Sequence, residues 1–311
     1  MPDLIFLASS PRVAPGQLTW QAWETLHAAG RVLTGDPDHP QLPYVRAAGV
    51  EVTVTPPDAG GLVRSAVDTS LVWLAAMDGD ENLMRDVGQA LLGLDEPPAV
   101  EVVHGAYDLP GARMLDLIAV MATLRRECPW DRKQTHASLA PYLLEEAYEV
   151  VDSIDDGDLE ALREELGDVL MQVAFHAEVA DDFTVDDVAE GIVDKLVRRH
   201  PHVFGDVTVA DADEVNANWD KIKSAERGDE ASVFKGVPMS QPALSLAAQL
   251  QRRAAKAGAP EELFADDEAG GELFALVQRL RAEGRDPEAE LRTAARRFRD
   301  RVEAWEDTTG A

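Results

Sequence analysis

The chain of 311 residues contains a single cysteine, Cys128, and few aromatic residues, which make up 6% of the sequence. One cysteine cannot form an intramolecular disulfide and has no partner for a soft-metal site, so a disulfide-stabilised secreted domain is excluded. Cys128 precedes Pro129 and Trp130. We interpret it as a packing residue rather than a nucleophile.

Long hydrophobic runs are also absent. No apolar stretch approaches the roughly 20 residues that a membrane-spanning helix needs. The N-terminal apolar run, residues 4–8, is short and lacks the basic residues that precede the apolar part of a signal peptide. We therefore expect a cytoplasmic protein that has no membrane partner.

Basic residues are scarce: the sequence has 29 Lys and Arg and 58 Asp and Glu, which gives a formal net charge of −29. This charge argues against nucleic acid and anionic membranes as partners. It also repels phosphate-bearing substrates, unless a divalent cation held by clustered acids reverses the field locally. We interpret most of the acidic residues as solvated surface.

Residues 1–108 alternate short apolar runs with helical patterns, which predicts a small, degenerate α/β region. Strands are expected over 4–8, 31–33 and 50–55, helices over 19–29 and 42–48, and mixed helical character over 62–76. Three strands are too few for a complete doubly wound domain.

From residue 109 the pattern is helical and strongly charged, so the protein is expected to be mainly α. We expect a catalytic domain over 109–235 and a further helical region over 236–311. The expected helices are 112–126, 138–154, 158–180, 184–200, 211–226, 241–257, 270–283 and 287–305.

Two of these helices carry four carboxylates at matching spacings. Glu146 and Glu149 are three residues apart on the first helix, and Glu165 and Asp168 are three apart on the second, so each pair shares a helix face. In an antiparallel hairpin that turns at Gly157, the two pairs lie level, because 146 and 168, like 149 and 165, are equally far from the turn. The four carboxylates are therefore expected to converge.

The same hairpin predicts its turn and its packing. Gly157 supplies an unusual backbone conformation, and Asp158 is a candidate cap for the second helix. Ala147 and Gly167 are small and lie level, which predicts a close approach of the helices. The residues expected on the buried face are Leu143, Ala147, Val150, Ile154, Leu159, Leu162, Leu166, Val169 and Val173.

Four ionised carboxylates without a counter-charge would strongly destabilise a fold. Hard divalent cations resolve this, and all-oxygen ligation suits Mg²⁺ or Mn²⁺. A di-iron bundle would instead contain Glu-x-x-His pairs, whereas Asp168 ends the second pair here. The alternative is a solvated acidic face, which fits Glu145, Glu160 and Glu164.

These residues resemble the MazG family of all-α nucleoside triphosphate pyrophosphohydrolases, whose pattern is Glu-Glu-x-x-Glu followed by Glu-x-x-Asp. The resemblance covers residues 112–260 and implies the MazG-like helical bundle. The matching stretches are Glu145-Glu146-x-x-Glu149, Glu165-x-x-Asp168, Cys128-Pro129-Trp130-Asp131-x-x-Gln134-Thr135-His136, Lys195-Leu196-x-Arg198-Arg199-His200-Pro201-His202-Val203-Phe204, and Glu214-Val215-x-x-Asn218-Trp219 with Ile222-Lys223.

The resemblance implies hydrolysis of NTPs and dNTPs to monophosphate and pyrophosphate with Mg²⁺, which Mn²⁺ can replace, as nucleotide-pool house-cleaning. It also implies a homodimer. Glu145 and Glu149 are the candidate catalytic residues, with water attacking the α-phosphorus, although a surface role for Glu145 remains open. The implied metal ligands are Glu146, Glu149, Glu165 and Asp168, and the implied substrate-binding residues are Lys195, Arg199 and Lys223 for the triphosphate and Trp219 for the base or ribose.

Two alternatives stay open: a catalytically weak nucleotide sensor or interaction protein, and a narrower hydrolase of dUTP, dCTP or a signalling nucleotide. Residues 236–311 resemble a degenerate second copy of the MazG domain, with Gly271 where an aspartate is expected, so no second active site is expected. Residues 1–108 faintly resemble a truncated tetrapyrrole-methylase domain without its Gly-rich loop, so methylation is not expected.

Overall fold

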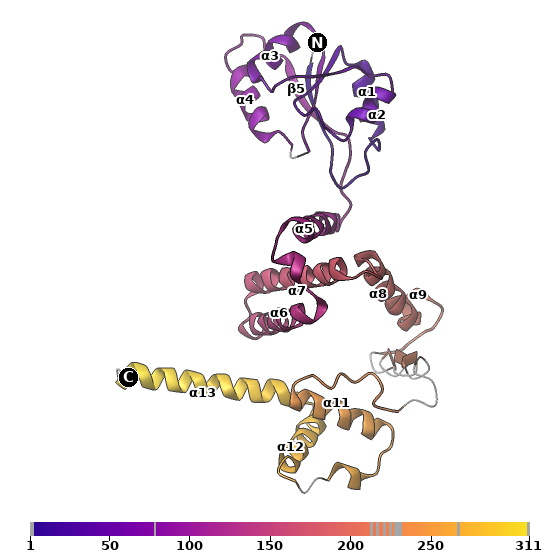
Figure 1. Cartoon of the computed structure of the whole chain (residues 1–311), viewed down its shortest axis with the longest axis vertical. Helices are drawn as coiled ribbons and strands as arrows, with labels where there is room; N and C mark the ends of the chain where they lie inside the picture. The colour runs from indigo at the N-terminus through magenta and orange to yellow at the C-terminus, as the bar shows by residue number, and fades with distance from the viewer. Residues whose placement is uncertain are drawn as a thin grey trace. The chain divides into compact units, whose positions relative to one another are not determined.

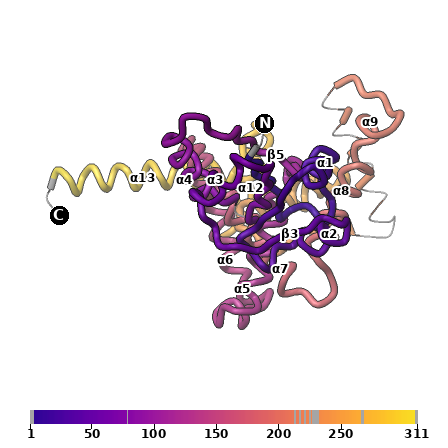
Figure 2. Tube along the Cα trace, turned by 90° about the horizontal axis from the view of Figure 1, so that it is seen from above, coloured from indigo at the N-terminus to yellow at the C-terminus, as the bar shows by residue number. Residues whose placement is uncertain are grey.

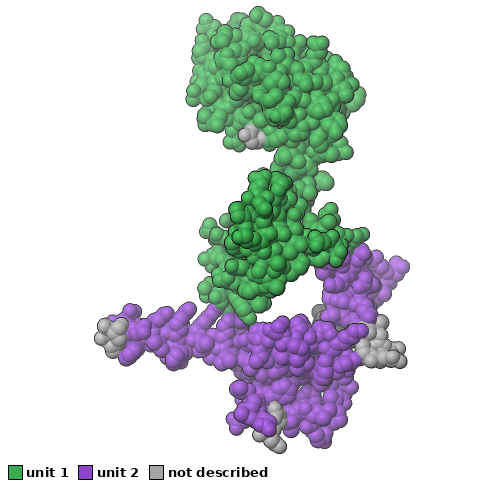
Figure 3. Space-filling model, viewed as in Figure 1, with its two compact units in different colours: residues 1–190 green, residues 191–311 purple. Residues whose placement is uncertain are grey.

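The computed structural model describes residues 3–77, 79–211, 214–215, 218–219, 222–223, 226, 232–265 and 268–309. It contains two compact units, residues 1–190 and 191–311, coloured separately in Figure 3. The described residues are mainly helical, with a parallel sheet near the N-terminus (Figure 1). The expected fold class, a mainly α protein preceded by an α/β region, is confirmed. The expected domain boundaries at 108 and 235 stay a prediction.

The sheet has five parallel strands in the order β3-β2-β4-β1-β5. The strands are β1 Asp3–Ala8, β2 Arg31–Thr34, β3 Val52–Val54, β4 Leu71–Leu74 and β5 Ala99–His104. The connecting helices are α1 Trp20–Ala28, α2 Leu42–Ala47, α3 Ala59–Asp68 and α4 Glu81–Leu91. One hydrophobic cluster joins the sheet to α1 and α2, and another joins it to α3 and α4. Both faces of the sheet are therefore covered.

The strand count predicted from the sequence was too low, because β4 and β5 were missed. β4 lies inside the segment 62–76, to which mixed helical character was assigned. Its four residues, Leu71–Leu74, are all fully buried. A central parallel strand that is covered on both faces has no polar alternation, so its sequence does not show the strand period.

Helix α4 was not predicted from the sequence, and the α3 region was expected only as the mixed segment 62–76. The helices that follow the sheet in the first unit agree with their expected bounds within about two residues. They are α5 Arg113–Glu127, α6 His136–Asp156, α7 Leu159–Val179 and the first part of α8 Val185–Arg199, with a short 3₁₀ turn at Asp131–Lys133. α6 and α7 form the expected helical hairpin (Figure 1). A small core of Met121, Leu139, Ala174 and Phe175 packs α5 against this hairpin.

The second unit contains the end of α8, α9 Pro201–Phe204, α11 Ala243–Lys256, α12 Gly271–Ala282 and α13 Pro287–Thr309, with a 3₁₀ turn at Glu261–Phe264. The helix expected over 211–226 falls largely outside the described residues. Within this unit, α13 contacts α11 and α12 and then extends away from them (Figure 2). None of the described helices has both the length and the apolar composition that crossing a membrane requires.

Candidate metal centre

The turn between α6 and α7 forms as the sequence predicted. Gly157 ends α6 in the left-handed conformation, with φ at 71°, which a residue with a side chain rarely adopts. Asp158 then caps α7, because its Oδ1 accepts hydrogen bonds from the backbone N–H groups of Glu160 at 3.0 Å and Ala161 at 3.1 Å. These local interactions set the register of the hairpin.

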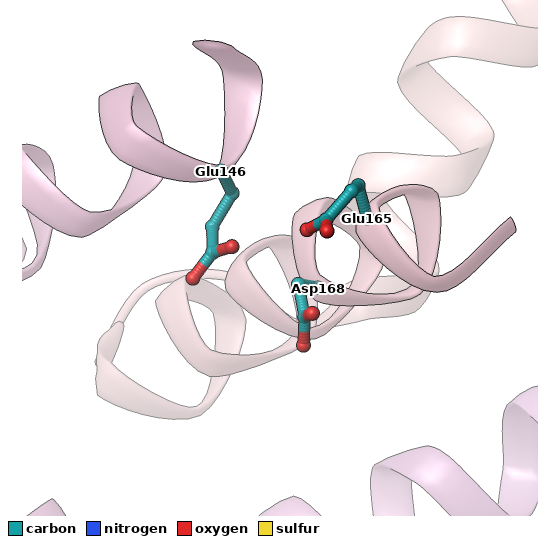
Figure 4. A group of neighbouring side chains, drawn as sticks. All are labelled: Glu146, Glu165 and Asp168. Atoms are coloured by element: carbon teal, nitrogen blue, oxygen red, sulfur yellow. The ribbon is translucent and has the colours of Figure 1, made fainter. Parts of the chain in front are cut away.

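That register brings the predicted carboxylates together. Glu146 extends from α6 toward Glu165 and Asp168 on α7, and one carboxylate oxygen of each lies within 4.8 Å of the others (Figure 4). All three side chains are half-buried. Glu149 is more exposed, and its negative charge helps to raise the pKa of both Glu146 and Glu165, which places it beside them. The four acids therefore form one cluster, which we call the acidic cluster.

Crowding changes the acidity of two members of the acidic cluster. Burial, followed by the charges of Asp168 and Glu149, raises the pKa of the Glu146 carboxyl above its ordinary value. Burial, followed by the charge of Glu149, raises the pKa of Glu165 in the same direction. Both groups would lose this penalty beside a positive charge. The donor set consists of carboxylate oxygens alone, which fits Mg²⁺ or Mn²⁺ and suits soft metals poorly.

The predicted substrate-binding residues lie in the second unit, and three of them meet. The guanidinium carbon of Arg199 lies 5.6 Å from the centre of the Trp219 ring, and the Lys223 Nζ lies 6.0 Å from it. Lys195 is exposed on α8, one helical turn before Arg199. Glu145 is exposed on α6, directly before Glu146 in the acidic cluster.

One neighbour of these residues was not found from the sequence. Glu226 binds Arg199 at 2.5 Å and Arg198 at 2.9 Å. It lies 27 residues after Arg199 and belongs to no motif, so only the tertiary structure reveals the ion pair. The carboxylate of Glu226 therefore binds the guanidinium group of Arg199, which the sequence analysis assigned to phosphate binding.

The predicted packing of the hairpin is wrong for the single chain. Gly167 and Ala147 are both exposed, and a Cβ added to Gly167 would meet no other atom within 4 Å. Much of the expected buried face is also exposed, with relative exposures of 57% for Ile154, 78% for Leu159 and 51% for Leu166. The hairpin packs on α5 through a different face. Leu139 near the start of α6 and Ala174 and Phe175 near the end of α7 form the buried contacts.

The fold and the site together define a helical protein with an all-oxygen carboxylate cluster on a hairpin. Residues 134–204, which contain this hairpin, match the family model described as the MazG nucleotide pyrophosphohydrolase domain. The chain belongs to the MazG family.

Curated relatives support this assignment. The chain is 48% identical over 242 residues to an uncharacterized 26.1 kDa protein of Streptomyces cacaoi, a match that covers 75% of this chain and 99% of the relative. It is 38% identical over 220 residues to the nucleoside triphosphate pyrophosphohydrolase/pyrophosphatase MazG of Thermotoga maritima, covering 62% of this chain and 85% of that protein. A match to the uncharacterized protein YabN of Bacillus subtilis is 44% identical and covers 58% of this chain but 43% of YabN.

Proposed function

We propose that this protein hydrolyses nucleoside triphosphates and deoxynucleoside triphosphates to the monophosphate and pyrophosphate. Glu146, Glu149, Glu165 and Asp168 would hold Mg²⁺, which Mn²⁺ can replace. The observation that supports this most directly is the convergence of three carboxylates from α6 and α7 within the segment that matches the MazG family. The relative from Thermotoga maritima is named for this activity.

The proposed mechanism gives each group of residues one task. When bound, the divalent cation supplies the positive charge that a phosphoryl group needs during transfer. Glu145 orients the attacking water toward the α-phosphorus and accepts its proton. Glu149 is the other candidate catalytic residue: its charge acts on Glu146 and Glu165, and we assign it a place among the metal ligands beside them.

The substrate is proposed to be held by Lys195, Arg199 and Lys223 at its triphosphate and by Trp219 at its base or ribose. The positions of Arg199 and Lys223 around the Trp219 ring support this assignment, since a flat aromatic face flanked by cations suits a nucleotide. A phosphate that binds Arg199 must replace the carboxylate of Glu226. Binding is therefore an exchange of one anion for another.

We also propose that the protein is a homodimer. Leu159, Leu166, Leu170 and Val173 recur at helical spacing along α7, and each is exposed in the single chain. A stripe of this kind is stabilised by a matching apolar face, and the same stripe of a second copy would provide one. The predicted close contact at Gly167 would then lie between chains rather than within one.

Product analysis tests the proposed reaction. The wild type, Glu149→Gln and the matched control Glu160→Gln, on an exposed position of α7, would be incubated with each NTP and dNTP, with and without Mg²⁺. We expect monophosphate and pyrophosphate from the wild type and the control only, and only with metal. Release of inorganic phosphate and a diphosphate would show that a different bond is cleaved. Metal-dependent nucleotide binding without turnover would favour a sensor.

A further inference from the structure

Among the described residues of the second unit, two neighbouring arginines form no ion pair. Arg252 on α11 and Arg281 on α12 line the same cavity, whose volume is about 570 Å³. Neither guanidinium forms an ion pair with any carboxylate of the described residues. In a chain with 58 acidic and 29 basic residues, two neighbouring arginines that form no ion pair with a described carboxylate need an explanation.

Arg281 is half-buried and lies beside the buried amide of Gln251. The side chain of Gln251 is 1% exposed, and its Nε2 donates a hydrogen bond to the backbone oxygen of Phe274 at 2.7 Å. The Oε1 of the same amide accepts from Arg281 Nη1 at 3.5 Å. Burial, followed by the charge of Arg252, lowers the pKa of Arg281. Two positive charges therefore lie near each other at this cavity.

The other charged groups around the cavity are already engaged. Arg285 binds Glu290 at 2.6 Å and Glu283 at 3.4 Å. Asp286 accepts a hydrogen bond from the backbone N–H of Ala289 at 2.9 Å and so caps α13. The carboxylate of Glu288 accepts hydrogen bonds from the backbone N–H and the hydroxyl of Ser245, which lines the cavity. Within the part of the chain that the structure describes, none of these carboxylates forms an ion pair with Arg252 or Arg281, so the arginine pair can accept an anion from outside the chain.

A second cavity also touches Arg281 and has a volume of about 460 Å³. Its other lining residues are four apolar ones, Ala255, Ala259, Phe264 and Ala282, together with Gln278 and the acidic Glu261. The guanidinium groups of the first cavity and the Phe264 ring of the second suit a molecule with a phosphate group and an organic body. The volumes fall in the usual range for sites that bind small molecules.

We propose that the cavity between α11 and α12 binds the phosphate group of a small molecule through the guanidinium groups of Arg252 and Arg281. The planar fork of a guanidinium matches the oxygens of a phosphate and forms charge-assisted hydrogen bonds with them. The site shares no residue with the acidic cluster or with Lys195, Arg199, Trp219 and Lys223, so it goes beyond the proposed hydrolysis. It requires no metal. The ligand is either free phosphate or pyrophosphate, or a nucleotide whose ring lies beside Phe264.

Calorimetric titration of the full chain in EDTA tests the site, with pyrophosphate, AMP and ATP as probes. We expect binding by the wild type and about tenfold weaker binding by Arg252→Gln and by Arg281→Gln, as for the loss of a charged hydrogen bond. Arg299→Gln is the control of equal charge, because Arg299 lies on α13 and pairs with Asp300 at 3.1 Å. Tighter binding of AMP and ATP than of pyrophosphate would identify an organic phosphate, and equal binding would identify an inorganic one.

A further variant keeps the test informative if Arg281→Gln folds poorly. Arg252 is exposed, so Arg252→Glu should fold and should place a carboxylate beside Arg281. We expect it to raise the thermal unfolding midpoint, because repulsion becomes attraction, and to abolish binding of all three probes. Binding by Arg252→Glu at wild-type strength would overturn the proposal.

Two active-site variants separate this site from the proposed hydrolysis. Glu149→Gln should lose hydrolysis and keep metal-free pyrophosphate binding. Arg199→Gln should keep that binding as well. Binding that is lost in Arg199→Gln and kept in Arg252→Gln, or no binding by the wild type at millimolar probe, would refute the arginine site and leave the proposed hydrolysis untouched.

Discussion

Arg199 Nη2 lies 2.5 Å from Glu226 Oε2, and Arg198 Nε binds the other oxygen of the same carboxylate at 2.9 Å. The hydrogen bonds from Arg199 and then from Arg198 lower the pKa of Glu226 from 4.5 to about 2. The carboxylate is therefore ionised throughout the neutral range. Its partner Arg199 is one of the residues proposed to bind the triphosphate. A change to this ion pair should therefore affect both the stability of the fold and the affinity for substrate.

The ion pair should make stability depend on pH in a defined window. A carboxylate whose folded pKa is depressed stabilises the fold above its ordinary value, and that contribution is lost as the pH falls toward the folded value. We expect the unfolding midpoints of the wild type and Glu226→Gln to differ at neutral pH and to converge as the pH falls from 4.5 to about 2. A difference that persists unchanged to the acid end would contradict the ion pair.

The same variant should bind substrate more tightly. Glu226 competes with phosphate for Arg199, so Glu226→Gln is expected to lower KM for nucleoside triphosphates by about two- to fivefold, the usual range for an exposed ion pair. We expect kcat to stay near the wild-type value. Steady-state kinetics with Glu303→Gln as an acidic control on α13 would show this, and an unchanged or raised KM would count against the competition.

Removing one acid from the cluster should have opposite effects with and without metal. Because the pKa of Glu146 is raised in the folded protein, the folded state favours the protonated carboxyl group. The resulting stability is fully present at low pH and is lost as the pH rises through the pKa of the folded state. At neutral pH in EDTA, Glu146→Gln should therefore unfold at a higher temperature than the wild type.

With Mg²⁺ bound, the wild type should become the more stable of the two proteins. Mg²⁺ at ten times its Kd should stabilise the wild type by about 1.4 kcal/mol and Glu146→Gln by much less. Thermal scans across a Mg²⁺ series measure both effects, with Glu160→Gln as the control. A variant that is less stable in EDTA, or that keeps the full response to Mg²⁺, would show that the cluster is not a metal site.

The exposed stripe on α7 predicts the oligomeric state. Leu166→Glu places a charge in the middle of the stripe, where the wild-type residue is 51% exposed in the single chain. We expect light scattering to give a dimer mass for the wild type and a monomer mass for this variant at micromolar concentration. Leu92→Glu, at a position that is 88% exposed in the α/β region, should remain dimeric. A monomeric wild type would refute the dimer.

One arginine joins the α/β region to the helices that follow it. Arg12 binds Asp108 through Nε at 2.8 Å and Asp116 of α5 through Nη1 at 2.8 and 2.9 Å. These hydrogen bonds lower the pKa of both carboxyl groups. The loop after β1, the segment after β5 and the start of α5 are therefore held by one side chain.

We expect Arg12→Gln to lower the unfolding midpoint by a few degrees and to speed limited proteolysis within residues 105–112. Arg113→Gln is the matched control, because the Arg113 side chain is 81% exposed and binds the same Asp116 at 2.9 Å from within α5. Cleavage at the same rate in both variants would show that Arg12 does not secure this segment.

The sequence by itself determined the features that depend on short stretches of chain. Helical periodicity placed most helix ends within about two residues, and Gly157 and Asp158 specified the turn through backbone conformation and capping. Because that turn sets the register, the spacing of Glu146, Glu165 and Asp168 was enough to predict that they meet.

Tertiary structure decided what depends on neighbours far apart in the chain. The burial of β4 on both faces, the ion pair of Arg199 with Glu226, and the side-by-side placement of Arg252 and Arg281 follow from no local pattern. The apolar pattern of α7 marked one side of the helix as apolar, yet several of its residues are exposed in the single chain, so the pattern could not say what covers them. Periodicity records which side of a helix is apolar, whereas only packing selects the surface that covers it.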